Sequence, residues 1–239
     1  MPSLLHLAKN RGFRDHGWLK TAHSFSFANY WDPNKMGFGA LRVLNDDTVA
    51  PGDGFDLHPH RDMEIITIPL SGSLQHEDNK GHKGVIGPGA VQVMSAGTGI
   101  VHSEMNASSE EPVSLFQLWI LPDQLDHDPR YEDKQFRAPA KNEFQLLVSP
   151  DGRHDSLMIH QQAFIVMGSF DKDTTYRLND SSHGVYAMVV DGEVEIDGKT
   201  LGKRDAIGIW ETDSIELKIK QDSKVLLIEV PMNETPSVD

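Results

Sequence analysis

The sequence predicts an all-β protein made of two antiparallel β-barrels or β-sandwiches. Its apolar runs are short, rich in β-branched residues and bounded by Gly, Pro, Asn, Asp and Ser. The same order of runs and turns also occurs twice along the chain, once in each half. No apolar stretch reaches the roughly 18 residues that a membrane-spanning helix needs.

Eight runs are expected to form strands because each combines β-branched or aromatic residues with flanking turn residues. They are residues 39–47, 63–72, 90–99, 114–122, 144–152, 184–198, 206–213 and 224–231. The segment Gln124–Lys134 differs, because Pro122, Pro129 and mixed charges surround it. We expect a short helix or loop there. We place the domain boundary in this segment, which gives domains 1–125 and 126–239.

The two halves resemble each other in detail. Residues 64–79 followed by 87–99 have the pattern of residues 185–198 followed by 203–213, with Gly72 and Gly192 in equivalent turns. A duplicated barrel explains the pattern, although any two β-meanders with Asp-Gly or Ser-Gly turns share some of it.

Composition limits the function. The chain has 239 residues, a formal net charge of −14 and a pI of about 5.2, so it should repel nucleic-acid backbones and anionic membranes. It has no cysteine, which excludes disulfides, thiolate ligands and a cysteine nucleophile. The N-terminus lacks a signal-peptide pattern, so a cytoplasmic location is expected.

Two short motifs offer four metal-binding side chains. They are His58-Pro59-His60 and His102-Ser103-Glu104, whose histidines His60 and His102 lie 42 residues apart. Residues at i and i+2 of a strand face the same way, about 6.6 Å apart, so each pair can approach one ion. With 12 histidines in the chain, one His-x-His pair arises readily by chance. The surrounding frame of glycines makes the pattern more specific, but a purely structural metal stays an alternative.

The whole frame resembles the two sequence boxes of the cupin superfamily, small β-barrels with a metal in the mouth. It reads Gly-x5-His-x-His from Gly52, then a turn at Gly72, then Gly-x-x-His-x-x-x-Asn from Gly99. More narrowly, residues 23–47 (HSFSFANYWDPNKMGFGALRVLNDD), 58–67 (HPHRDMEIIT) and 94–106 (MSAGTGIVHSEMN) resemble the pirin family of bicupins. The resemblance implies a bicupin, with two jelly-roll-like antiparallel barrels.

The carboxylate ligand is decided by strand phase. Ordinary cupins have a glutamate ligand at the position where this chain has Ile65. Glu64 precedes that position by one residue, so in a regular strand its side chain points to the opposite face, and only a bulge would bring it back. Glu104 is in phase with His102 instead. This matches the ligand set that the pirin resemblance implies, namely His58, His60, His102 and Glu104. The second half has Leu178-Asn179-Asp180 where its own His-x-His would fall, so we expect its barrel to lack metal ligands.

Imidazole and carboxylate ligands suit a divalent first-row ion. The pirin resemblance favours Fe(II), and the ligand types also suit Mn, Co, Ni, Cu or Zn. Two open positions on a six-coordinate ion would be free for substrate and dioxygen.

The other histidines are expected to be less important. His76 and His82 lie in the polar sequence QHEDNKGHKG and are interpreted as solvated loop residues, and His23 as a structural residue near the barrel mouth. The aromatic residues of the first phrase are interpreted as core, with some in the wall of an apolar pocket: Phe25, Phe27, Tyr30, Trp31 and Phe38.

The leading functional hypothesis follows from the resemblance. Bacterial pirin-like proteins are associated with quercetin 2,3-dioxygenase activity, in which dioxygen opens a flavonol ring with release of carbon monoxide. Glu104 would be both ligand and catalytic base, since no other carboxylate is expected in the same mouth. The alternative is an iron-binding, redox-sensing regulator that docks a protein partner, and an isomerase or a hydrolase of the cupin type also stays open.

Overall fold

The computed structural model describes residues 1–232 and consists almost entirely of β-structure. Within this range the strands form three sheets, antiparallel except for one parallel pair between β13 (Phe144–Ser149) and β14 (Leu157–Met158). Two short 3₁₀ helices accompany them, η1 (Ala8–Asn10) and η2 (Arg153–Asp155). No helix of the described chain is long and apolar enough to cross a membrane. The all-β prediction is confirmed.

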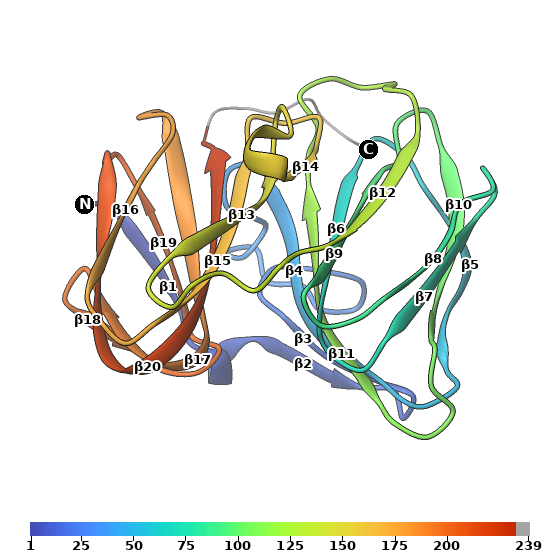
Figure 1. Ribbon diagram of the computed structural model, residues 1–239, viewed down its shortest axis with the longest axis horizontal. Helices are drawn as coiled ribbons and strands as arrows, with labels where there is room; N and C mark the ends of the chain where they lie inside the picture. The colour runs from blue at the N-terminus through green and yellow to red at the C-terminus, as the bar shows by residue number, and fades with distance from the viewer. Residues whose placement is uncertain (233–239) are drawn as a thin grey trace.

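The first half of the chain forms two facing sheets, seen on the right of Figure 1. The seven-stranded sheet has the order β12-β9-β6-β11-β4-β3-β2. Its strands are β2 (Gly12–Asp15), β3 (Leu19–His23), β4 (Leu41–Val49), β6 (Glu64–Ser71), β9 (Ala90–Ser95), β11 (Val113–Ile120) and β12 (Arg130–Gln135). The four-stranded sheet has the order β5-β10-β7-β8, with β5 (Gly54–His60), β7 (Leu74–Asp78), β8 (Lys83–Ile86) and β10 (Ile100–Asn106).

The second half forms a nine-stranded sheet that curls on itself, seen on the left of Figure 1. Its main order is β1-β19-β17-β20-β15-β13-β14, while β16 pairs with β20 and β18 pairs with β17. The strands are β1 (Ser3–His6), β13 (Phe144–Ser149), β14 (Leu157–Met158), β15 (Phe164–Phe170), β16 (Thr174–Arg177), β17 (His183–Ile196), β18 (Lys199–Leu201), β19 (Ala206–Trp210) and β20 (Ser214–Pro231).

Two strands pair across the division predicted after residue 125. β1, at the N-terminus, pairs with β19 of the second half, and β12 pairs with β9 of the first. The helix or loop expected over Gln124–Lys134 is therefore wrong for its second part, where Arg130–Gln135 is a strand. The charged sequence of β12 has a low β-propensity and does not predict a strand. The strand forms at the edge of the sheet because its hydrogen bonds with β9 stabilise it. The division into 1–125 and 126–239 stays a prediction, and residues 233–239 lie outside the described chain.

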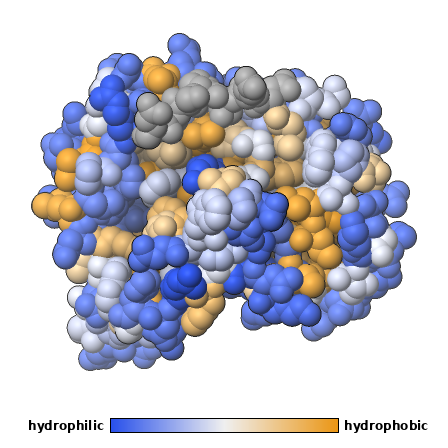
Figure 2. All heavy atoms as spheres, turned by 180° about the vertical axis from the view of Figure 1, so that it is seen from behind, coloured by the Kyte–Doolittle hydropathy of each residue, from blue (hydrophilic) through white to orange (hydrophobic). Residues whose placement is uncertain are grey.

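One hydrophobic core extends through both halves. It includes Leu44 and Ile66 from the first half together with Tyr186 and Leu226 from the second, all fully buried. Seen from behind, hydrophilic residues cover most of the surface, and hydrophobic residues reach it in separate patches (Figure 2). The shared core gives the barrel of the first half a rigid support on one side.

Candidate metal centre

Three histidines converge between β5 and β10. His58 and His60 come from β5 and His102 from β10, where His102 lies directly opposite His58. The ring centroids of His102 are 4.4 Å from His58 and 5.0 Å from His60, and one ring nitrogen of each of the three lies within 4.8 Å of the others. These residues can therefore hold one metal ion.

Glu104 lies beside this trio, on the same face of β10 as His102. Alternate residues of β10 are buried, which puts both side chains inside the barrel, as their phase predicts. A bulge follows, so that Glu104 opposes Phe55 on β5, three residues before His58. Its carboxylate groups with His102 and His76, and it lines the same cavity as His58 and His60.

Three side-chain donors hold the Glu104 carboxylate. Gln117 Nε2 donates to Oε2 at 2.6 Å, while Gln92 Nε2 and Thr67 Oγ1 donate to Oε1 at 3.2 and 3.3 Å. All three come from the seven-stranded sheet opposite β10. Side chains of the seven-stranded sheet thereby orient the Glu104 carboxylate, although Glu104 itself belongs to the four-stranded sheet.

These donors are part of a polar row, a line of polar residues that runs across the inner face of the seven-stranded sheet. Register places His23, Asn45, Gln117, Thr67 and Gln92 opposite one another on β3, β4, β11, β6 and β9. His23 Nδ1 contacts Asn45 Oδ1 at 2.8 Å. Polar residues at core-facing positions of five neighbouring strands are unusual in a barrel interior. Three of the five hold the Glu104 carboxylate, and the other two contact each other.

His76 was missed as a site residue. The sequence predicts a solvated loop residue at this position, but His76 is fully buried on β7, directly opposite Glu104 on β10. The polar sequence around it suggested a turn. The alternation of Leu74, His76 and Asp78, which are all buried, was the available signal for a strand. His82, by contrast, is partly exposed.

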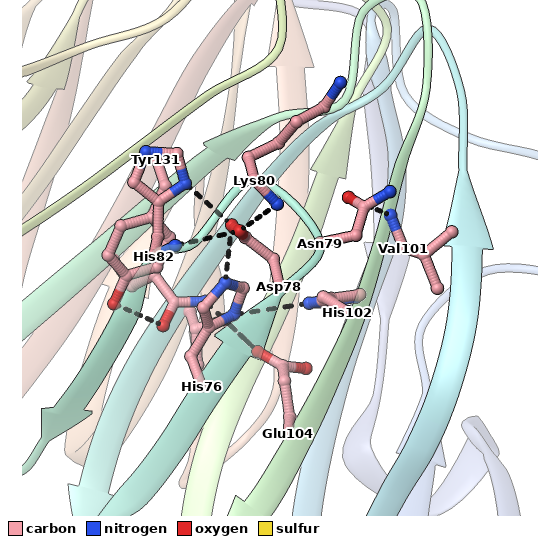
Figure 3. A network of polar contacts seen from close by, with 11 residues as sticks. His76, Asp78, Asn79, Lys80, His82, Val101, His102, Glu104 and Tyr131 are labelled. Atoms are coloured by element: carbon pink, nitrogen blue, oxygen red, sulfur yellow. Dashed lines mark hydrogen bonds and ion pairs between the residues drawn. The ribbon is translucent and has the colours of Figure 1, made fainter.

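A chain of hydrogen bonds runs from His102 to the surface (Figure 3). His102 Nδ1 lies 3.3 Å from His76 Nδ1, and His76 Nε2 lies 3.2 Å from Asp78 Oδ2. The same Asp78 oxygen is 2.9 Å from His82 Nδ1, and Asp78 Oδ1 accepts the backbone N–H groups of Lys80 and His82. Burial alone would raise the pKa of Asp78, but these hydrogen bonds lower it below its ordinary value.

This series of hydrogen bonds determines which ring nitrogen of His102 keeps a free lone pair. Because the Asp78 carboxylate only accepts, His76 Nε2 donates, and the Nδ1 of a neutral His76 must then accept from His102 Nδ1. That leaves a lone pair on His102 Nε2, which is buried and has no hydrogen-bond partner among the described residues. An orphaned imidazole nitrogen beside two further histidines fits a metal ion.

The electrostatics also favour metal binding. Burial lowers the pKa of His60 to about 4, and neighbouring His58 adds to the effect. Burial lowers the pKa of His102 still further, helped by His58, His60 and His76. Both rings are therefore neutral near pH 7, which is the form that binds a cation.

A cavity of about 190 Å³ opens beside these ligands. Phe27, Phe55 and Trp119 form its apolar walls, and Trp119 packs edge-on against His60 with 4.8 Å between ring centroids. Asp47 also lines it, which corrects the expectation that Glu104 is the only carboxylate in the mouth. Asp47 lies two residues after Asn45 on β4, so both side chains are on the same face of the strand. The sequence Asn45-Asp46-Asp47 does not by itself show which aspartate faces the cavity.

The other sequence predictions have mixed outcomes. His23 is buried in the cavity wall, and of the five aromatic residues only Phe27 lines this cavity. Phe25 and Phe38 are in the core, whereas Trp31 is 71% exposed. Glu64 belongs to neither group of metal-binding side chains, and its Oε2 accepts a hydrogen bond from Ser95 at 2.7 Å.

A second, larger cavity of about 370 Å³ lies between the two halves. Its lining includes Ile68 and Val91 from the first half and Leu147 and Met167 from the second. None of the grouped histidines lines it. Within the described residues, both groups of potential metal ligands lie in the first half, around the smaller cavity.

Comparison with known proteins agrees with this architecture. Residues 5–120 match the family model described as Pirin, and residues 146–230 match the Quercetinase C-terminal cupin domain. A quercetin 2,3-dioxygenase of Escherichia coli K12 is 44% identical over 229 residues, which span 95% of this chain and 98% of that protein. The chain belongs to the pirin family.

Other members of the pirin family are similarly close. A pirin-like protein of Caulobacter vibrioides is 41% identical and covers 91% of this chain and 95% of its own length. The crystal structure of the bacterial pirin YhhW from Escherichia coli in complex with nickel(II) is 43% identical, with a TM-score of 0.91 over 96% of this chain and 99% of that one. The bicupin prediction is thereby confirmed.

Proposed function

We propose that this pirin-family protein is a metal-dependent quercetin 2,3-dioxygenase, which opens a flavonol ring with dioxygen and releases carbon monoxide. The observation that carries the proposal is the trio of buried His102 with half-buried His58 and His60, beside an aromatic-walled cavity. The relative named as a quercetin 2,3-dioxygenase at 44% identity supports it.

We assign His58, His60, His102 and Glu104 as ligands of one divalent ion. Fe(II) is the proposed occupant, while Mn, Co, Ni, Cu or Zn suits the same ligand types. Bound there, the ion would act as a Lewis acid toward the flavonol 3-hydroxyl and assist electron transfer from the ring to dioxygen.

The chain's own residues would position the substrate and move its proton. Phe27, Phe55 and Trp119 would hold a flat aromatic ring and exclude water from the cavity. Glu104 would accept the 3-hydroxyl proton as general base. Its carboxylate is already oriented by Gln117, Gln92 and Thr67.

The test is carbon monoxide release from quercetin by protein loaded with each metal in turn. We expect release only from a metallated form, and a decrease of at least about 100-fold in His60→Ala, which removes a direct ligand. His16→Ala, at an exposed position, is the matched control. Absence of carbon monoxide from every fully metallated form would contradict the proposal.

The regulatory alternative, with a docked protein partner, stays a prediction that no specific feature of residues 1–232 favours. A cytoplasmic location belongs to the proposal too, and the absence of cysteine agrees with it.

A further inference from the structure

Asp47 is a buried carboxylate in the cavity wall that the proposed reaction does not use. It lies on β4, is 3% exposed and lines the same cavity as His58, His60 and Glu104. Its Oδ1 atom is buried and has no hydrogen-bond partner among residues 1–232. Asp47 thus brings a buried acceptor without a partner into the wall of the cavity.

The neighbours of Asp47 are already engaged. Asn45 Oδ1 is taken by His23, and both oxygens of Glu104 accept hydrogen bonds from the polar row. A buried acceptor without a partner is unfavourable, since it has lost its water without replacement. The cavity wall thus has a carboxylate acceptor without a partner at Asp47, and it is aromatic at Phe27, Phe55 and Trp119.

Strand phase distinguishes Asp47 from its neighbour. Asp46 points to the other face of β4, where Arg204 Nε donates to it at 2.8 Å and Arg11 Nη2 at 3.3 Å. In the part of the chain that the structure describes, the nearby arginines pair with Asp46 and no cation pairs with Asp47. Two adjacent aspartates therefore have different surroundings, one in an ion pair and one in the cavity.

We propose that Asp47 is a specificity-determining residue whose Oδ1 accepts a hydrogen bond from a second hydroxyl of the aromatic substrate, distinct from the hydroxyl that faces the histidines. The substrate class is then a polyhydroxylated flavonol. This inference rests on the proposed function, because it takes its ligand from that reaction.

The experiment compares two ligands and measures binding alone. Quercetin carries the 3-hydroxyl and four others, while 3-hydroxyflavone keeps only the 3-hydroxyl. Protein loaded with Ni(II) is titrated with each under argon by calorimetry, so that no turnover is needed. In Asp47→Leu, which is similar in size and has no acceptor, we expect quercetin to bind about 10–100-fold more weakly, as for a buried hydroxyl left without its acceptor.

The binding of 3-hydroxyflavone should be unchanged in Asp47→Leu, and Asp47→Asn, which keeps an amide oxygen, should restore most of the quercetin affinity. Asp46→Asn is the matched control and should leave the ratio of the two affinities as in the native protein. Equal weakening of both ligands, or no weakening of either, would overturn the proposal.

The native protein gives a second test that needs no variant. It should bind quercetin at least about tenfold more tightly than 3-hydroxyflavone, the lower end expected for one such hydrogen bond. Equal affinities would also overturn the role of Asp47. Failure to release carbon monoxide would contradict the dioxygenase proposal alone, since the preference in binding is measured without oxygen.

Discussion

At the scale of single residues, two buried glutamates of the first half have different surroundings. Glu64 and Glu104 are each 1% exposed. Glu104 accepts hydrogen bonds from three side chains and stands beside His102. Glu64 has one side-chain donor, Ser95, and burial raises its pKa to about 7. A glutamate that is hard to ionise and lies outside both groups of potential metal ligands is suited to a structural role.

Glu64→Gln should therefore stabilise the protein in alkaline solution. The folded pKa of about 7 is above the ordinary value of 4.5, so ionisation of Glu64 opposes folding above pH 7, and this penalty disappears as the pH falls toward 4.5. Since a tenfold change in proton affinity is worth about 1.4 kcal/mol, the variant should gain up to about 3 kcal/mol in free energy of unfolding at pH 8.5 and little at pH 4.5. Urea unfolding at several pH values measures this.

Metal content provides the control for that variant. Glu64→Gln should bind metal as the native protein does, because Glu64 lies outside both groups of potential ligands. Loss of metal would instead identify Glu64 as a ligand and contradict the assignment of Glu104.

At the scale of elements, the site depends on the close approach of β5 and β10. A Cβ atom on Gly54 would lie 2.3 Å from the Glu104 carbonyl oxygen and 2.6 Å from Met105 Cα. Both are backbone atoms, which cannot move aside as a side chain can. Glycine at position 54 thus allows the pairing that brings His102 opposite His58.

Gly54→Ala should force the two strands apart. We expect a loss of about 1–3 kcal/mol in free energy of unfolding, as for other overpacked sites, and weaker metal binding because the histidine trio spans both strands. Gly202→Ala is the control, since its nearest neighbour would be Asp205 Oδ2 at 3.8 Å. Thermal unfolding and competition with a chelator measure the two effects. A Gly54→Ala protein with native metal affinity would show that the spacing of the strands does not govern the site.

The sequence predicted the parts of the site that depend on local spacing, and missed those that depend on register. His-x-His and His-x-Glu pairs reveal which side chains share a face, because strand periodicity is local. His76 and Asp47 become site residues only because β7 pairs with β10 and because β4 borders the cavity. The strand β12 was missed for the same reason, since its partner β9 lies about 40 residues earlier in the chain.

At the scale of the whole molecule, the N-terminal strand connects the two halves. Residues 3–6 of β1 pair with residues 206–209 of β19, and His6 Nδ1 lies 2.8 Å from the hydroxyl of buried Tyr186. The backbone N–H of Ala8 then donates to Asp205 at 2.7 Å. The second barrel is thus completed by the first residues of the chain. The first barrel is in turn extended by β12, which follows it in sequence.

Removal of residues 1–7 should therefore destabilise the second half while leaving the metal centre in place. The deletion exposes the edge of β19 and leaves the Tyr186 hydroxyl buried without its partner, which by itself costs about 1–3 kcal/mol. For a chain of this length, that corresponds to a fall of about 3–10 °C in Tm, measured by calorimetry. Hydrogen exchange should speed up in β19 and β17 before β5 and β10, and the His58–His60–His102 trio should still bind metal. An extension placed before Met1, which keeps β1, should leave the Tm unchanged. If β19 stays as protected in the shortened chain as in the full one, its ladder with β1 contributes no stability, and the second barrel is complete without the N-terminal strand.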